Sequence, residues 1–187
     1  MRILGICGNM KPHSATAAVL KLTLDASARA GSEITFYDIA EAPLPFCDAR
    51  DDESSYPAEV HRFRKLVHDA QGIILATPDY HNSFSGALKN ALDLCSSEEF
   101  DHKIVGIIGV AGGGTGAINA ITQLRTVMRS VGAWVIPHQV SIANSSKLFS
   151  GPDTIADAAV AKRIERLGTD VVKYANLFAK GLLEEAM

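Results

Sequence analysis

The chain alternates short apolar runs with segments of helical spacing, and this alternation strongly limits the folds it can adopt. Each apolar run has the length and near-continuous hydrophobicity of a buried parallel strand. Strands are expected at residues 3–7, 34–37, 72–77, 104–110 and 134–142. Helices are expected at residues 14–30, 57–70, 85–95, 117–132 and 154–185, with Gly31 and Gly132 ending two of them.

Strands separated by helices indicate βα units and a parallel sheet. Right-handed crossovers place the helices on both faces of such a sheet. We therefore expect an α/β fold, a flavodoxin-like three-layer sandwich whose five-stranded parallel sheet has the order 2-1-3-4-5. At 187 residues the chain fits a single domain spanning residues 1–187.

The composition excludes several classes of protein. A net charge of −3, with Lys and Arg spread along the chain, predicts neither nucleic-acid nor membrane binding. The apolar run at the N-terminus is too short for a secretory or membrane-spanning segment, so a cytoplasmic protein is expected. Cys7, Cys47 and Cys95 show no metal-binding spacing, and no metal site or disulfide framework is predicted. Cys7 is expected to pack as a small apolar residue.

The loop after the first strand is rich in hydrogen-bond donors. It precedes a helix, whose N-terminus offers unpaired N–H groups and the positive end of a dipole. A phosphate cradle would use the side chains of Asn9, Lys11, Ser14 and Thr16. In the alternative interpretation Ser14 only caps the helix and Lys11 is solvated, and the spacing does not decide between the two.

The loop after the third strand is a second candidate, because ligands of open α/β sheets bind at the carboxyl ends of central strands. Its candidate residues for the ring side of a ligand are Pro78, Asp79, Tyr80, His81, Asn82 and Ser83. Each has a structural alternative, since Asp79 can cap a turn and Tyr80 can pack. Lys89 and Asp93, four residues apart on a helix, are interpreted as an ion pair.

The loop after the fourth strand contains a GxGxxA pattern from Gly112 to Ala117. A dinucleotide-binding enzyme is one interpretation, but that fingerprint belongs at the first strand and needs an acidic residue about twenty positions later. Gly112, Gly113 and Gly114 would instead present backbone N–H groups to the edge of a flat heterocycle. No HExxH or GxSxG pattern is present, which disfavours metalloenzyme and serine-hydrolase chemistry.

Together the three loops resemble the NADPH-dependent FMN reductase family. The first loop is similar to G-S-x-R-x-x-S-x-N, with departures at Asn9, Lys11 and Thr16. The third is similar to P-E-Y-N-x-S-x-P-G-x-L-K-N-x-x-D, with Asp79, His81 and Ser85 substituted. The fourth, with the following Gln-Leu-Arg at residues 123–125, resembles G-G-x-x-A-x-x-Q-L-R.

The resemblance implies FMN as cofactor, NADPH or NADH as electron donor, and a homodimer or homotetramer. It places the FMN phosphate in the first loop and the ring between the third and fourth. The flavin carries the chemistry, so no catalytic side chain is assigned. The expected acceptor is a quinone, an azo compound, a metal oxyanion or free flavin. The alternative is a flavodoxin-like FMN module for electron transfer that does not itself oxidise NAD(P)H.

Overall fold

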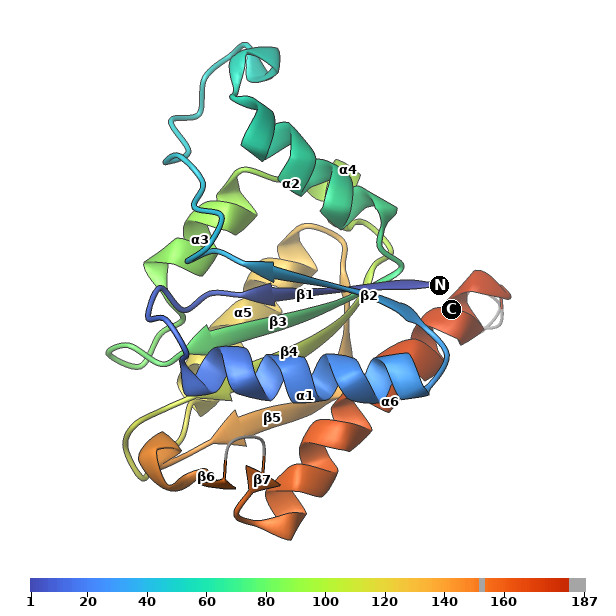
Figure 1. The fold of residues 1–187 in the computed structure, drawn as a ribbon. Coiled ribbons are helices and arrows are strands. Elements are labelled where there is room, and N and C mark those ends of the chain that lie inside the picture. Colours follow the sequence, from blue (N-terminus) through green and yellow to red (C-terminus); the bar gives the residue numbers. More distant parts are fainter. Residues whose placement is uncertain (152–153, 182–187) are drawn as a thin grey trace.

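A five-stranded parallel sheet forms the centre of the protein in the computed structural model, which describes residues 1–151 and 154–181 (Figure 1). The strand order is β2-β1-β3-β4-β5, which confirms the predicted order. β3 and β4 are buried along their whole length. The strands are β1 (Arg2–Cys7), β2 (Glu33–Asp38), β3 (Gly72–Pro78), β4 (Ile104–Val110) and β5 (Trp134–Ile142).

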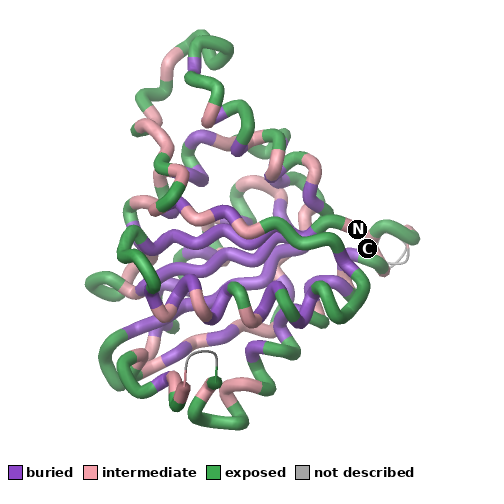
Figure 2. The backbone as a smooth tube through the Cα atoms, viewed as in Figure 1, coloured by how far each residue is buried: buried purple, intermediate pink, exposed green. Residues whose placement is uncertain are grey.

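Helices cover both faces of the sheet. They are α1 (Ala15–Arg29), α2 (Ala58–Asp69), α3 (Gly86–Asp93), α4 (Ser97–Phe100), α5 (Ile118–Ser130) and α6 (Ala158–Ala179). α1 and α6 pack against one face, whereas α2, α3 and α5 pack against the other (Figure 1). The two apolar layers between helices and sheet hold most of the buried residues (Figure 2). Within the described residues, no helix is long and apolar enough to span a membrane.

The element boundaries correct the sequence prediction in two places. The helix expected at residues 85–95 ends at Asp93, and a separate short helix, α4, follows it. The helix expected at residues 154–185 spans only Ala158–Ala179: at its start β7 (Thr154–Ile155) pairs antiparallel with β6 (Phe149–Gly151), and at its end Lys180 is the C-cap. Residues 182–185 of the expected helix lie outside the described part of the chain.

Other local predictions are confirmed. Gly31 and Gly132 follow the last turns of α1 and α5 with φ of +91° and +79°, a conformation that glycine adopts without steric cost. Cys7 is completely buried. Lys89 and Asp93 form an ion pair on α3, with Nζ 2.5 Å from Oδ1.

The edge strand β5 carries an irregularity that α5 stabilises. Its register against β4 shifts between the partners of Val105 and Ile107. The Arg125 guanidinium donates to the Ile136 carbonyl at 2.9 Å and to Gln139 Oε1 at 3.2 Å. Arg125 therefore provides a donor to a backbone carbonyl and to a side chain of β5 within the stretch where the register shifts.

The first residue of β5 belongs to an aromatic cluster. Trp134, the single tryptophan of the chain, packs edge-on against Phe178 of α6, with ring centroids 5.5 Å apart. His102 stacks on Phe178 as well, with ring centroids 5.7 Å apart. The cluster lies at the amino ends of the strands and secures the C-terminal helix to the sheet.

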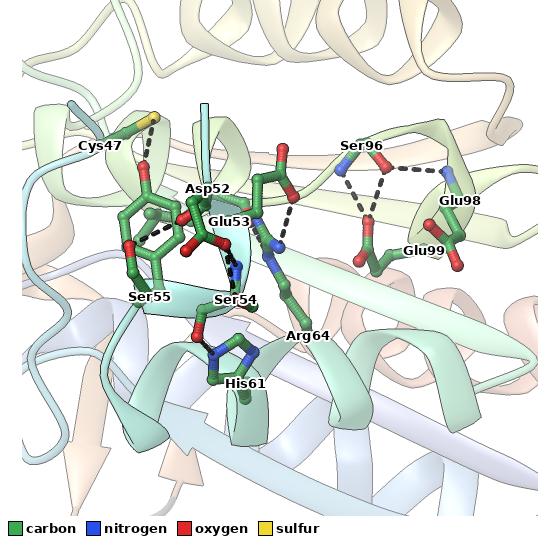
Figure 3. Close-up of polar contacts among 12 residues, drawn as sticks. Cys47, Asp52, Glu53, Ser54, Ser55, His61, Arg64, Ser96, Glu98 and Glu99 are labelled. Carbon is green, nitrogen blue, oxygen red and sulfur yellow. Dashed lines mark hydrogen bonds and ion pairs between the residues drawn. The ribbon is translucent and has the colours of Figure 1, made fainter. Parts of the chain in front are cut away.

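The long segment between β2 and α2 crosses the outside of α3 (Figure 1). Asn90 of α3 anchors it, since the amide donates to the Pro45 carbonyl at 2.9 Å and accepts from the Cys47 N–H at 2.9 Å. Farther along, Arg64 of α2 points to Glu53, with Nη1 2.7 Å from Oε2 (Figure 3). The segment is thus fixed at several points, although Phe46 stays 86% exposed.

Candidate functional site

The first loop joins β1 to α1 and is organised by Asn9. Its side-chain amide donates to Thr16 Oγ1 at 3.1 Å, and its carbonyl accepts from the Lys11 N–H at 2.9 Å. Ser14 is the N-cap of α1, since its hydroxyl accepts from the Ala17 N–H at 3.2 Å. The cap leaves the first N–H groups of α1 facing the loop, where an anion is favoured.

The third loop contains a tight turn at residues 80–83, here called the ring-side turn. Tyr80 and Ser83 pair as a two-residue hairpin, with backbone hydrogen bonds of 2.9 and 3.1 Å. His81 and Asn82 between them have φ of 56° and 64°. The Asp79 carboxylate accepts from the Asn82 N–H at 3.0 Å through Oδ1. Its Oδ2 is buried and has no hydrogen-bond partner among the described residues.

Tyr80 connects the third loop to the first. Its hydroxyl lies 3.4 Å from Asn9 Oδ1, and its side chain is 52% exposed. A half-exposed aromatic ring beside a polar loop offers a flat apolar surface to a ligand.

The fourth loop is closed by the segment that follows β5. The Asn144 N–H donates to the Gly113 carbonyl at 3.0 Å, and the Ser145 N–H donates to the Ala111 carbonyl at 3.0 Å. Ser141 Oγ accepts from the Ala117 N–H at 2.9 Å at the start of α5. These bonds place the short helix η2 (Ser145–Lys147) beside the glycine loop.

The loops line an open cavity of about 320 Å³ at the carboxyl ends of β1, β3 and β4. The sequence predicts a ligand at this edge of the sheet. The cavity is lined by Asn9, Lys11, His13, Ser14, Ala15, Thr16, Pro78, Asp79, Tyr80, Val110, Gly112, Ser145 and Ser146.

The structure brings most of the candidate residues to this cavity. All four candidates of the first loop line it, as do Pro78, Asp79, Tyr80 and Gly112. The remaining candidates do not line it: His81, Asn82, Ser83, Gly113 and Gly114. For every candidate residue, contact with a ligand stays a prediction.

The sequence analysis missed the contribution of the fifth strand. Ser145 and Ser146 line the cavity, although no motif marks them. The signal that could have found them is topological, because the residues that follow β5 share the sheet edge with the other loops. His13 was also missed; it occupies the first loop with φ of 53°.

The ionisable groups at the site do not include an activated thiol. Cys7 lies at the end of β1 below the first loop, and its burial raises the pKa of the thiol to about 11. Within the described residues, no group of three or more His, Cys, Asp or Glu side chains is arranged to hold a metal ion. The positive charge at the cavity comes from Lys11 and from the N-terminus of α1.

Known proteins resemble this chain in sequence and in fold. A model of the family "NADPH-dependent FMN reductase" matches residues 1–147. An NADPH azoreductase of a Bacillus species is 39% identical over 140 residues, which cover 75% of each chain. An FMN-dependent NADPH-azoreductase of Staphylococcus haemolyticus is 30% identical over 181 residues, which cover 94% of this chain and 96% of the relative.

Solved structures share the fold at lower identity. The flavoenzyme NAD(P)H:(acceptor) oxidoreductase FerB of Paracoccus denitrificans has a TM-score of 0.79 and 19% identity, covering 94% of this chain and 97% of the other. The apo form of an NADH:FMN oxidoreductase has a TM-score of 0.74 and 22% identity, covering 92% and 89%. The family model covers most of the chain, and the strand order is the expected one. The chain therefore belongs to the NADPH-dependent FMN reductase family, the oxidoreductases that use FMN and NADPH.

Proposed function

We propose that the cavity binds FMN with its phosphate at the N-terminus of α1. The observation that carries this proposal is that Lys11, the capped helix start at Ser14 and Thr16, which Asn9 holds, line the cavity together. An anion gains there from a full charge and from the helix dipole together. Lys11 is a point charge without the bidentate fork of arginine, so it contributes attraction more than orientation.

The side of the cavity formed by the third and fourth loops suits a flat ring. Tyr80 supplies apolar surface and Pro78 borders the cavity from the buried end of β3. Gly112 leaves the backbone accessible, because no heavy atom lies within 4 Å of the position a Cβ would occupy. The donor set of the cavity, a cationic and N–H-rich end beside an apolar end, fits the two halves of FMN. The outer candidates from His81 to Ser83, with Gly113 and Gly114, complete the proposed ring-side shell.

Bound flavin supplies the hydride and electron chemistry of the reaction. The protein's residues bind and orient it: the first loop fixes the phosphate end, and Tyr80 and the glycine loop fix the ring end. No side chain of the cavity is assigned a proton transfer.

The test is to titrate the protein with FMN and with riboflavin, following the quenching of flavin fluorescence, and then to add NADPH without oxygen. FMN should bind at least about tenfold more tightly than riboflavin, because a phosphate contact worth roughly 1.4 kcal/mol gives that ratio. NADPH should then bleach the flavin absorption. Equal affinity for the two flavins would contradict the phosphate assignment.

We further propose that the acceptor is a flat aromatic molecule, with azo compounds as the first class to test. Two relatives are named as azoreductases. Met10 and Tyr80, on the first and third loops, are 50% and 52% exposed, and they offer apolar surface to a planar acceptor. An azo dye, a quinone, chromate and free FMN should be compared at fixed NADPH. Turnover of chromate alone would contradict a flat aromatic acceptor.

Three further sequence predictions stay proposals. They are a single domain over residues 1–187, a homodimer or homotetramer, and a location in the cytoplasm. Ile118 at the start of α5, the helix that follows the glycine loop, is 42% exposed. Sedimentation at micromolar protein should give a dimer or tetramer. A monomer would contradict the assembly.

A further inference from the structure

The ring-side turn needs support from outside itself. A two-residue hairpin of this kind requires positive φ at both central positions, and glycine or asparagine is usual there. Here the first position is His81, and its φ of 56° places a side chain in a conformation that is costly for L-residues. Such conformations persist where surrounding contacts determine them, often at functional sites.

The outward face of α5 supplies these contacts. Gln123 uses both ends of its side-chain amide: Nε2 donates to the Asn82 carbonyl at 2.8 Å, and Oε1 accepts from Ser83 Oγ at 2.6 Å. One turn earlier, Asn119 Nδ2 donates to Asn82 Oδ1 at 3.3 Å. Asp79 Oδ1 accepts from the backbone N–H of Asn82, so both α5 and the third loop itself hold the turn.

The support reaches the cavity through Tyr80. Ser83 and Tyr80 exchange both backbone hydrogen bonds, so a fixed Ser83 fixes the backbone of Tyr80, which lines the cavity. Gln123 itself does not line it. α5 begins directly after the glycine loop, and Gln123 therefore ties the third loop to the fourth across the site.

We infer that Gln123 is a positioning residue of the flavin site, which sets Tyr80 by clamping the ring-side turn onto α5. The inference rests on the proposed function, because the ligand it serves is FMN. Gln123 acts through Asn82 and Ser83 and touches no reacting atom.

The experiment measures the Kd of FMN for the wild-type protein, Gln123→Ala and Gln123→Glu. Gln71 offers a matched control at the opposite end of the sheet. Its amide also donates to one backbone carbonyl, that of Asp69, and accepts from one donor, the Arg2 N–H, both at 2.9 Å. Gln123→Ala should raise the Kd about tenfold, because it removes two hydrogen bonds that hold the turn. Gln71→Ala should leave the Kd unchanged.

The Gln123→Glu variant adds a readout that general loss of stability does not produce. A protonated carboxyl can donate to the Asn82 carbonyl and accept from Ser83, whereas a carboxylate can only accept. The ionisable groups nearby in the third loop, Asp79 and His81, are present in Gln123→Ala as well and cancel in a ratio of the two variants. The ratio of the Kd of Gln123→Glu to that of Gln123→Ala should therefore be lowest at about pH 4, where a glutamate of ordinary pKa is largely protonated, and rise by about pH 7.

Each outcome decides one question. A wild-type protein that binds no FMN overturns the proposed function and this inference with it. FMN binding by Gln123→Ala at the wild-type Kd overturns the inference alone. The inference is also overturned if Gln123→Ala and Gln71→Ala weaken FMN binding equally. A ratio of the Kd of Gln123→Glu to that of Gln123→Ala that does not change with pH overturns it as well.

Discussion

Replacing Gly8 with alanine should push the first loop away from α3. Gly8 follows β1, where its N–H donates to the Ala76 carbonyl at 2.8 Å and its carbonyl accepts from Ser85 Oγ at 2.5 Å. A Cβ on Gly8 would lie 2.7 Å from Leu88 Cβ and 3.0 Å from Ser85 Oγ. Both neighbours belong to α3 or its cap, so the first loop and α3 must move apart.

The size of the effect follows from these distances. Carbon atoms in contact prefer about 3.5–4.0 Å, and relieving the clash at Leu88 requires a shift on the order of 1 Å. Overpacking of a closed interior costs about 1–3 kcal/mol. For a protein of this length each kcal/mol lowers the Tm by about 2–4 °C, so Gly8→Ala should lose about 2–12 °C.

Gly86 provides the matched control on the same helix. It begins α3, and no heavy atom lies within 4 Å of its hypothetical Cβ. Gly86→Ala should keep the wild-type Tm or raise it, because alanine favours the helix by up to about 1 kcal/mol. The assay is thermal unfolding followed by circular dichroism, with the FMN Kd measured in parallel. A Gly8→Ala protein that melts with or above Gly86→Ala would refute the reasoning.

Three further predictions concern single side chains. Ser14→Ala removes the cap of α1 and should lower the free energy of unfolding in urea by about 0.5–2 kcal/mol. It should also weaken the binding of FMN more than that of riboflavin, and an equal loss of affinity for both would argue against a phosphate at this helix. Arg125→Lys loses the guanidinium fork that serves Ile136 and Gln139 and should lower the free energy of unfolding by about 1–3 kcal/mol; an unchanged urea midpoint would contradict that role. In the folded protein the pKa of the Cys7 thiol is raised from 9.0 to about 11. The unfolded state therefore loses this proton first, and the free energy of unfolding should fall between about pH 9 and about pH 11. Urea unfolding across this range should show a flatter dependence on pH for Cys7→Ala.

The sheet was predictable because each strand is encoded locally. Runs such as the one ending at Cys7 and the one from Ile104 to Val110 are apolar throughout, and connecting helices leave few ways to order five parallel strands. The first loop was predictable for the same reason, since its donors lie between a strand and a helix.

What could not be predicted depends on contacts between distant residues. The hairpin of β6 and β7 interrupts a helical pattern, and only the pairing of Phe149 with Ile155 reveals it. Ser145 reaches the cavity through a backbone bond to Ala111, more than thirty positions earlier in the chain. Gln123 is visible in the sequence only as part of a motif, and its two partners in the ring-side turn require the fold.

The position of the single tryptophan gives the protein two separate optical signals. Trp134 packs on Phe178 at the amino end of β5, whereas the cavity lies beyond the carboxyl end of the neighbouring strands. From Trp134 to Ile142 the strand spans roughly 26 Å at about 3.3 Å per residue. In the flavin-free protein, indole emission will therefore follow the docking of α6 without a contribution from the cavity. Emission from FMN released by the protein appears at a longer wavelength, so the two signals can be recorded in one cuvette.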